Sequence, residues 1–230
     1  KLGYETDTED VTGETIAEGD AAVLAHLTQA DVEHAILSFI GKYDQIPPMY
    51  SAIKKDGKKL YEYARAGIEI KREPRPVEIY AIQDIKKEAD DTYSFDVYCS
   101  KGTYIRSLCR DIGRKLSCMA VLSGLLRKEV HGFSVTEALT LQEIETRQAD
   151  GTLQEAILPV DSLLQQYPAY EVIGQAENYL KNGNKLSPRF FKDMGETCDS
   201  RIRVYHAGEF AALYDYKEEE QIYKPFKMFL

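Results

Sequence analysis

The stretch from Ser100 to Ser107 places an aromatic side chain and a guanidinium where a strand gives way to a helix. Before it, residues 93–100 alternate between two faces, as a half-buried strand does. Beyond Gly102, apolar residues recur at helical spacing, and Thr103 is suited to cap that helix. Arg106 then falls in the first helical turn, which favours anions by about 0.3–1 kcal/mol. An arginine there predicts a carboxylate or a phosphate nearby in space.

Arg106, Arg110 and Arg114 follow at intervals of four residues, which places them on one face of the helix. For Arg110 and Arg114 we expect a solvated surface stripe. For Arg106, the turn position and the neighbouring Tyr104 favour a functional site. Taken alone, Tyr104 and Leu125 are both typical of residues packed in a core.

Charge is distributed unevenly along the chain. Its 230 residues carry a net charge of −9, which argues against holding nucleic acid by bulk electrostatics. Residues 41–75 reverse this balance with nine basic and five acidic side chains, and four tyrosines are interleaved with them. Cations beside aromatic rings suit a phosphate backbone with unstacked bases. A helix from Gly57 to Ala66, capped by Asp56 and with a solvated lysine face, is the alternative, and both interpretations can hold together. Prolines on either side indicate an inserted arm.

We predict no metal site and no membrane segment. The cysteines and histidines lack metal-ligand spacing, and free thiols are expected. The run from Asp7 to Asp10 lacks the alternate carboxylates of a calcium loop and is expected to be solvated. Short apolar runs and the absence of signal-peptide character at Lys1 predict a soluble, cytoplasmic protein.

The remaining pattern predicts an α+β fold with a β-rich C-terminal part. Residues 22–40 are expected to form an amphipathic helix, with a break near Asp31 as a second N-cap as the alternative. Thr140 with Glu143 is expected to form a capping box. A turn is expected at 86–91, and a second unit is expected to begin near Tyr167 and to form a small β-barrel. The strands are expected at 77–85, 93–100, 125–130, 201–205, 210–216 and 222–230.

Three long stretches carry a resemblance to a known family. They are Leu-Gly-Tyr-Glu-Thr-Asp-Thr at 2–8, Gln-Ile-Pro-Pro-Met-Tyr-Ser-Ala-Ile-Lys with the following Gly-Lys-Lys-Leu-Tyr-Glu-Tyr-Ala-Arg within 45–65, and Cys-Ser-Lys-Gly-Thr-Tyr-Ile-Arg at 99–106. Together they resemble the bacterial TruB pseudouridine synthases. Leu125-Leu126-Arg127 is similar to that family's Leu-Arg-Arg segment, and the C-terminal unit is loosely similar to its PUA domain. The resemblance covers nearly the whole chain.

The resemblance implies an isomerase that flips a uridine out of the tRNA T-loop, at position fifty-five, and converts it to pseudouridine without metal or cofactor. It makes Tyr104 and Leu125 substrate-binding residues and pairs Arg106 with the catalytic aspartate. Arm 46–75 would clasp the T-arm, and the C-terminal barrel would touch the acceptor stem. We expect RNA contacts from Lys54, Lys58, Lys59, Tyr61, Arg65 and Arg127.

In that family, the nucleophilic aspartate and a base-stacking tyrosine precede the stretch that begins here at Leu2. We therefore expect a mostly antiparallel pseudouridine synthase fold in an N-terminally incomplete catalytic domain, residues 1–165, with a PUA-like domain at 166–230. We expect this piece to be a monomer and inactive by itself. Asp44, Asp111 and Asp161 occur in contexts of loop, helix surface and linker and offer no substitute.

Two alternatives stay open. The chain could be a non-catalytic module that binds structured RNA, or a tRNA chaperone. It could also be a metabolic enzyme or an interaction domain without an RNA role, which fits the acidic composition.

Overall fold

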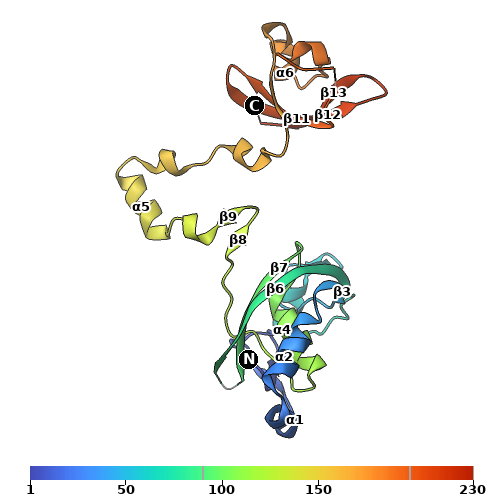
Figure 1. The fold of residues 1–230 in the computed structure, drawn as a ribbon, viewed down its shortest axis with the longest axis vertical. Helices are drawn as coiled ribbons and strands as arrows, with labels where there is room; N and C mark the ends of the chain where they lie inside the picture. The colour runs from blue at the N-terminus through green and yellow to red at the C-terminus, as the bar shows by residue number, and fades with distance from the viewer. Residues whose placement is uncertain (90, 197, 230) are drawn as a thin grey trace. The chain divides into compact units, whose positions relative to one another are not determined.

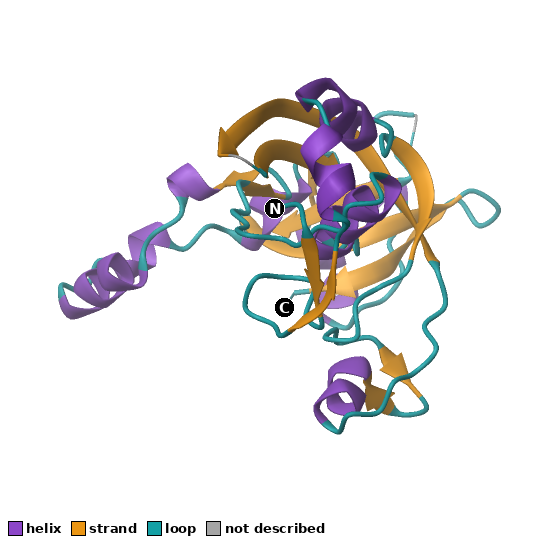
Figure 2. Cartoon of the chain, turned by 90° about the horizontal axis from the view of Figure 1, so that it is seen from below, coloured by secondary structure: helices purple, strands orange, loops and turns teal. Residues whose placement is uncertain are grey.

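The computed structural model describes residues 1–230 apart from 90, 197 and 230. The chain divides into two compact units, residues 1–126 and 127–230, and each is described by itself. Both units contain helices and mostly antiparallel strands, which confirms the predicted α+β class (Figures 1 and 2). The contacts divide after Leu126 rather than near 165, and the domain limits 1–165 and 166–230 stay a prediction.

The first unit is built on a three-stranded antiparallel sheet in the order β3-β6-β7. Its elements are β1 (Tyr4–Thr6), β2 (Thr15–Glu18), α1 (Ala21–His26), α2 (Gln29–Leu37), β3 (Gly41–Gln45), β4 (Lys54–Lys55), β5 (Lys58–Lys59), α3 (Leu60–Arg65), β6 (Arg75–Ala89), β7 (Thr92–Cys99) and α4 (Ile105–Lys115). The strands predicted at 77–85 and 93–100 are confirmed as β6 and β7, but β6 continues to Ala89, where a turn was predicted from residue 86. An exposed antiparallel ribbon tolerates polar side chains, so the lysines at 86 and 87 pair across to β7.

Helices α2 and α4 pack side by side against the sheet (Figure 1). Their buried residues form one core with the sheet: Val32, Ile36, Ile79, Ile82, Leu108 and Ile112. The helix predicted for 22–40 is two helices, α1 and α2, so the alternative of a break is confirmed, but the break lies at 27–28 instead of at Asp31. Thr28 caps α2 in a capping box with Asp31, so Asp31 is the third helical residue rather than a cap.

The arm, residues 46–75, contains a short hairpin formed by β4 and β5. Lys54 and Lys55 pair with Lys59 and Lys58 around a turn in which Asp56 and Gly57 both have positive φ, at 50° and 82°. The predicted helix from Gly57 is therefore wrong at its start, because an Asp-Gly pair favours a tight hairpin turn.

The second unit contains a four-stranded sheet in the order β10-β11-β12-β13, in which only the first pair is parallel. Its elements are β8 (Glu129–Val130), β9 (Phe133–Ser134), η1 (Val135–Glu137), α5 (Leu141–Ala149), η2 (Leu153–Ala156), η3 (Val160–Leu164), β10 (Ala169–Glu171), η4 (Gly174–Ala176), α6 (Glu177–Lys181), η5 (Pro188–Phe190), β11 (Arg201–His206), β12 (Glu209–Lys217) and β13 (Ile222–Met228). The strands predicted at 201–205, 210–216 and 222–230 are confirmed with small changes at their ends. The capping box of Thr140 and Glu143 is confirmed at α5. Of the strand predicted at 125–130, only Glu129 and Val130 form a strand, which is β8.

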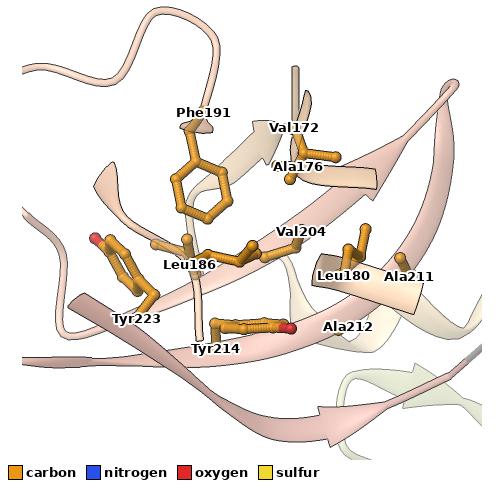
Figure 3. Close-up of a cluster of buried hydrophobic side chains, with 11 residues drawn as sticks. Val172, Ala176, Leu180, Leu186, Phe191, Val204, Ala211, Ala212, Tyr214 and Tyr223 are labelled. Atoms are coloured by element: carbon orange, nitrogen blue, oxygen red, sulfur yellow. The ribbon is translucent and has the colours of Figure 1, made fainter. Parts of the chain in front are cut away.

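The predicted barrel is not closed among the strands that the structure describes. One face of the sheet is covered instead by the helical segment between β10 and β11, which supplies Leu180, Leu186 and Phe191 to the core. Figure 3 shows Leu186 and Phe191 near Tyr214 and Tyr223 of the sheet, and Leu180 beside Ala211. Because short helices fill this side, the core is complete without further strands. Within the described part of the chain, no helix has the length and apolarity needed to cross a membrane.

Candidate functional site

Helix α4 begins one residue before Arg106. Its N-cap is Tyr104, whose backbone is extended and whose side chain makes no capping hydrogen bond. The predicted cap by Thr103 is wrong, because that hydroxyl donates to the carbonyl of Ser100 at 2.9 Å instead. Arg106 lies in the first turn, as predicted.

The guanidinium of Arg106 contacts three acceptors. Nη2 donates to the carbonyl of Tyr50 in the arm, and Nη1 donates to the carbonyl of Thr8 at 3.5 Å. The same Nη1 lies 3.8 Å from Oδ2 of Asp10, and both side chains are about one quarter exposed, at 24% and 27%. The anion predicted from the helix position is therefore present in this chain as Asp10. The pairing of Arg106 with a separate catalytic aspartate stays a prediction.

The loop that carries Asp10 is tightly hydrogen bonded, and the prediction of a solvated loop holds only in part, because Asp7, Thr8 and Asp10 are part-exposed while Glu9 is buried. The Asp10 carboxylate accepts hydrogen bonds from the hydroxyl groups of Thr8 and Thr12 and from the backbone N–H of Thr12. Burial by itself would raise the pKa of Asp10, but these hydrogen bonds, together with Arg106, lower the pKa below its ordinary value. Asp10 is therefore ionised at neutral pH.

Arg110 is a buried residue, so the surface stripe predicted for it is wrong. Its side chain is only 5% exposed and forms an ion pair with the buried Glu9. It also donates to Asp111 from both Nε and Nη2, at 2.9 and 2.7 Å. Arg114 fits the prediction in part, because its side chain is 53% exposed while both its Nε and Nη2 donate to Glu5 at 2.8 Å.

The three arginines of α4 thus face three acidic residues of the N-terminal segment in reversed order. Their acidic partners are Asp10 for Arg106, Glu9 for Arg110 and Glu5 for Arg114. About one hundred residues separate the arginine from the acidic residue in each pair. Nothing local shows that they meet.

Gln45 is a further residue of this region that sequence reasoning missed. It ends β3, is 1% exposed, and binds the backbone of Tyr104 on both sides. Its Oε1 accepts from the Tyr104 N–H at 2.9 Å, and its Nε2 donates to the Tyr104 carbonyl at 3.1 Å. Nε2 also donates to the hydroxyl of Tyr43 at 2.6 Å. Burial, with Asp111 nearby, raises the pKa of Tyr43 to about 12, so this phenol stays neutral.

In the arm, the cations of Lys59 and Arg65 both lie close to the aromatic ring of Tyr61. Nζ of Lys59 lies 5.4 Å from the centre of the Tyr61 ring, and Cζ of Arg65 lies 5.3 Å from it. Lys54 is opposite Lys59 in the hairpin, and Lys58 is exposed near the turn. Five of the residues predicted to contact RNA are therefore brought together, while their role in RNA binding stays a prediction.

The remaining predicted residues lie outside this group. Leu125 is 61% exposed and is the second-last residue of the first unit, and Arg127 is the first residue of the second unit. The described residues include no group of histidine, cysteine or acidic side chains that could hold a metal ion.

Comparison with known proteins decides the family. Residues 1–105 match the model described as TruB family pseudouridylate synthase (N terminal domain), and residues 106–165 match the tRNA pseudouridylate synthase B C-terminal domain. The tRNA pseudouridine synthase B of Alkaliphilus oremlandii is 40% identical over 228 residues, which cover 99% of this chain and 74% of that protein. The chain belongs to the TruB family. The TruB protein of Bacillus subtilis is 39% identical over 236 residues, covering 100% of this chain and 75% of the relative.

For a third TruB relative, from Clostridium perfringens, identity is 42% over 186 residues, covering 81% of this chain and 61% of the relative. Solved structures agree on the fold. The crystal structure of a Cbf5-Nop10-Gar1 complex superimposes with a TM-score of 0.62 at 20% identity, covering 89% of this chain and 63% of the matched one. The structure of an H/ACA RNP bound to a substrate RNA superimposes with a TM-score of 0.62 at 18% identity, covering 89% of this chain and 62% of the matched chain. The predicted pseudouridine synthase fold is thereby confirmed for this TruB chain.

Proposed function

We propose that this chain is the part of a tRNA pseudouridine synthase that holds the T-loop and supplies the arginine of its active site. The observation that carries the proposal is the guanidinium of Arg106, held at the start of α4 between Asp10 and the arm. In the reaction, the bond between uracil N1 and the ribose C1′ breaks. The ring turns, a bond forms between C5 and C1′, and the proton on C5 is lost while N1 gains one. The product is an isomer, so no oxidant or co-reactant is needed.

Arg106 is suited to hold a second carboxylate. A guanidinium carries five N–H donors, and here Nη1 and Nη2 are only partly used by acceptors at 3.5 to 3.8 Å and by Tyr50. A positive charge next to a catalytic aspartate keeps that aspartate ionised and fixes its orientation. We place the nucleophilic aspartate outside residues 1–230, as the family resemblance implies, and expect this chain alone to bind RNA without turnover.

Tyr104 and Leu125 are the proposed contacts of the flipped uracil. Tyr104 stands two residues before Arg106, so a base stacked on its ring would lie close to the guanidinium. Leu125 is exposed, which suits an apolar wall that becomes covered when a base enters. The proposed target is the uridine at position fifty-five of tRNA.

The arm is the proposed clasp for the T-arm. Lys54, Lys58 and Lys59 surround the hairpin and suit phosphate contacts, while Tyr61 with Arg65 offers a ring and a cation for an unstacked base. Arg127 is proposed to contact the RNA, and the PUA-like residues 166–230 are proposed to contact the acceptor stem. We propose a cytoplasmic monomer that needs neither metal nor cofactor.

An isotope-release assay tests this proposal. T-arm RNA labelled with tritium at C5 of uracil releases tritium only when C5 becomes bonded to ribose. We expect no release from the 230-residue protein, and release from a version extended upstream by the segment that carries the nucleophile. In the extended version, Arg106→Gln should lower the rate of tritium release by several orders of magnitude, because the aspartate loses its counter-ion. Release from the 230-residue protein would contradict the placement of the nucleophile.

The alternative of a non-catalytic RNA-binding module or tRNA chaperone is distinguished by the same assay. It predicts RNA binding, but no release even from the extended protein. A protein without an RNA role predicts no measurable binding to T-arm RNA at low salt.

A further inference from the structure

We infer that Glu9 is a positioning residue that fastens both ends of the arm to helix α4. The physical coupling is a property of the structure itself, and its consequence for RNA recognition rests on the proposed function. Glu9 lies in the loop between β1 and β2 and belongs to neither the arm nor the helix.

The Glu9 carboxylate is buried and bound from two directions. It is 7% exposed, and its Oε2 accepts from the hydroxyl of Ser107 at 2.5 Å while Oε1 accepts from Nη1 of Arg110. Nη1 of Arg72, from the far end of the arm, lies 3.9 Å from the same Oε1. A buried carboxylate is costly unless it is paired and hydrogen bonded, so these donors and Glu9 require one another.

Both arginines continue from Glu9 to the first residues of the arm. Nη2 of Arg110 donates to the carbonyl of Ile46 at 2.9 Å, and Nη1 of Arg72 donates to the carbonyl of Pro47 at 3.1 Å. Arg72 itself stands near the end of the arm. One carboxylate therefore connects the helix, the entry of the arm and its exit.

Arg106 is placed by the same arrangement. It lies one turn before Arg110 on α4, and its guanidinium binds the carbonyl of Tyr50, three residues after Pro47. Without the charge of Glu9, the buried Arg110 and the part-buried Arg72 would be neighbouring like charges whose remaining acceptors are mainly backbone carbonyls and Asp111. Their repulsion would favour release of the arm base, and Tyr50 would then leave Arg106.

Glu5 provides a matched control. It is also buried and belongs to the same N-terminal segment, and it pairs with Arg114 near the other end of α4. The contacts described for Glu5 and Arg114 do not include the arm. Loss of charge at Glu5 should therefore affect stability without affecting the arm.

Hydrogen–deuterium exchange of the 230-residue protein, without RNA, tests the coupling. We expect Glu9→Gln to raise exchange roughly tenfold in peptides covering 46–53 and 66–75, with β6 and β7 unchanged. Glu5→Gln should leave the arm peptides within about twofold of wild type. Unchanged arm exchange in Glu9→Gln, or an equal rise in Glu5→Gln, would overturn the inference.

A second variant keeps the test decisive if Glu9→Gln does not fold. Arg72→Gln, at a side chain that is 21% exposed, should raise exchange at 66–75 more than at 46–53, because Ile46 stays bound to Arg110. Unchanged exchange at 66–75 in Arg72→Gln would overturn the inference without the Glu9 variant. Where Glu9→Gln folds, the double variant should show less than the sum of the two effects, and full additivity would contradict a shared connection. Filter binding of T-arm RNA then separates the two proposals. A loosened arm with unchanged RNA affinity would keep the anchoring role of Glu9 and contradict the proposed role of the arm.

Discussion

The side-chain amide of Gln45 and the backbone of Tyr104 form a closed pair of hydrogen bonds, at 2.9 and 3.1 Å. The pair joins the end of β3 to the residue that precedes α4. Because Tyr104 has no side-chain cap of its own, Gln45 fixes the backbone at the point from which Arg106 projects.

Removal of this amide should destabilise the first unit. In Gln45→Leu, the N–H of Tyr104 loses its partner in a part-buried place, which costs about 1–3 kcal/mol. The carbonyl of Tyr104 keeps the hydrogen bond that it accepts from the N–H of Leu108 at 3.0 Å. Urea unfolding measures the change. Gln165→Leu is the control, because Gln165 is exposed and donates only to the carbonyl of Asp161; we expect about 0.5 kcal/mol or less there. Equal losses in the two variants would contradict this role of Gln45.

Asp10 should make the first unit sensitive to acid. Its folded pKa is lowered, so the stability that it contributes is fully present above the pKa of an unfolded aspartate, about 3.9, and is lost as the pH falls through the folded value. The difference in stability between wild type and Asp10→Asn should therefore shrink from pH 5 toward pH 2. Chemical unfolding at each pH measures it. A difference that stays constant across this range would show that ionisation of Asp10 contributes nothing.

The lysines of the arm should account for part of the salt dependence of RNA binding. Lys58→Glu with Lys59→Glu should weaken T-arm binding and reduce the slope of log affinity against log salt by about 1.5, for two lost phosphate contacts. Lys86→Glu with Lys87→Glu makes the same change of charge on β6, outside the arm. Filter binding at several salt concentrations compares them. If both pairs weaken binding equally, the effect comes from net charge and not from the arm.

Substitution of Gly113 by a residue with a side chain should destabilise the first unit. A Cβ at this position would lie 2.2 Å from the backbone nitrogen of Ala120, so the segment after α4 would have to move. We expect Gly113→Ala to cost about 1–3 kcal/mol by overpacking. Gly124→Ala, with nothing within 4 Å of the added atom, should change stability by less than about 0.5 kcal/mol. Thermal unfolding of the two variants gives the comparison.

Elements governed by local pattern could be predicted from the sequence. The strands of the second unit and the capping box at Thr140 depend on alternation and on residues three apart. The hairpin at Asp56 and Gly57 was also encoded locally, but helical spacing further along the arm concealed it. The position of Arg106 in the first turn was predictable for the same reason.

The environment of that turn was not predictable from the sequence. Arg110 has the spacing of a surface residue, and only the approach of Glu9 from 101 residues away makes it a buried one. Likewise, Gln45 has no distinguishing pattern until β3 brings it to Tyr104. Burial of charge depends on long-range packing, which a single sequence does not display.

The reversed order of charges along α4 has a consequence for its axial position. If the helix slid by one turn, Arg110 would move to the place of Arg114 or of Arg106, and one arginine would have no acid opposite it. The arginine left over would be Arg114 or Arg106, whose side chains are 53% and 24% exposed, so the slide would lose one partly exposed ion pair. The three pairs therefore favour the observed register, and the position of Arg106 depends on charge as well as on hydrophobic packing.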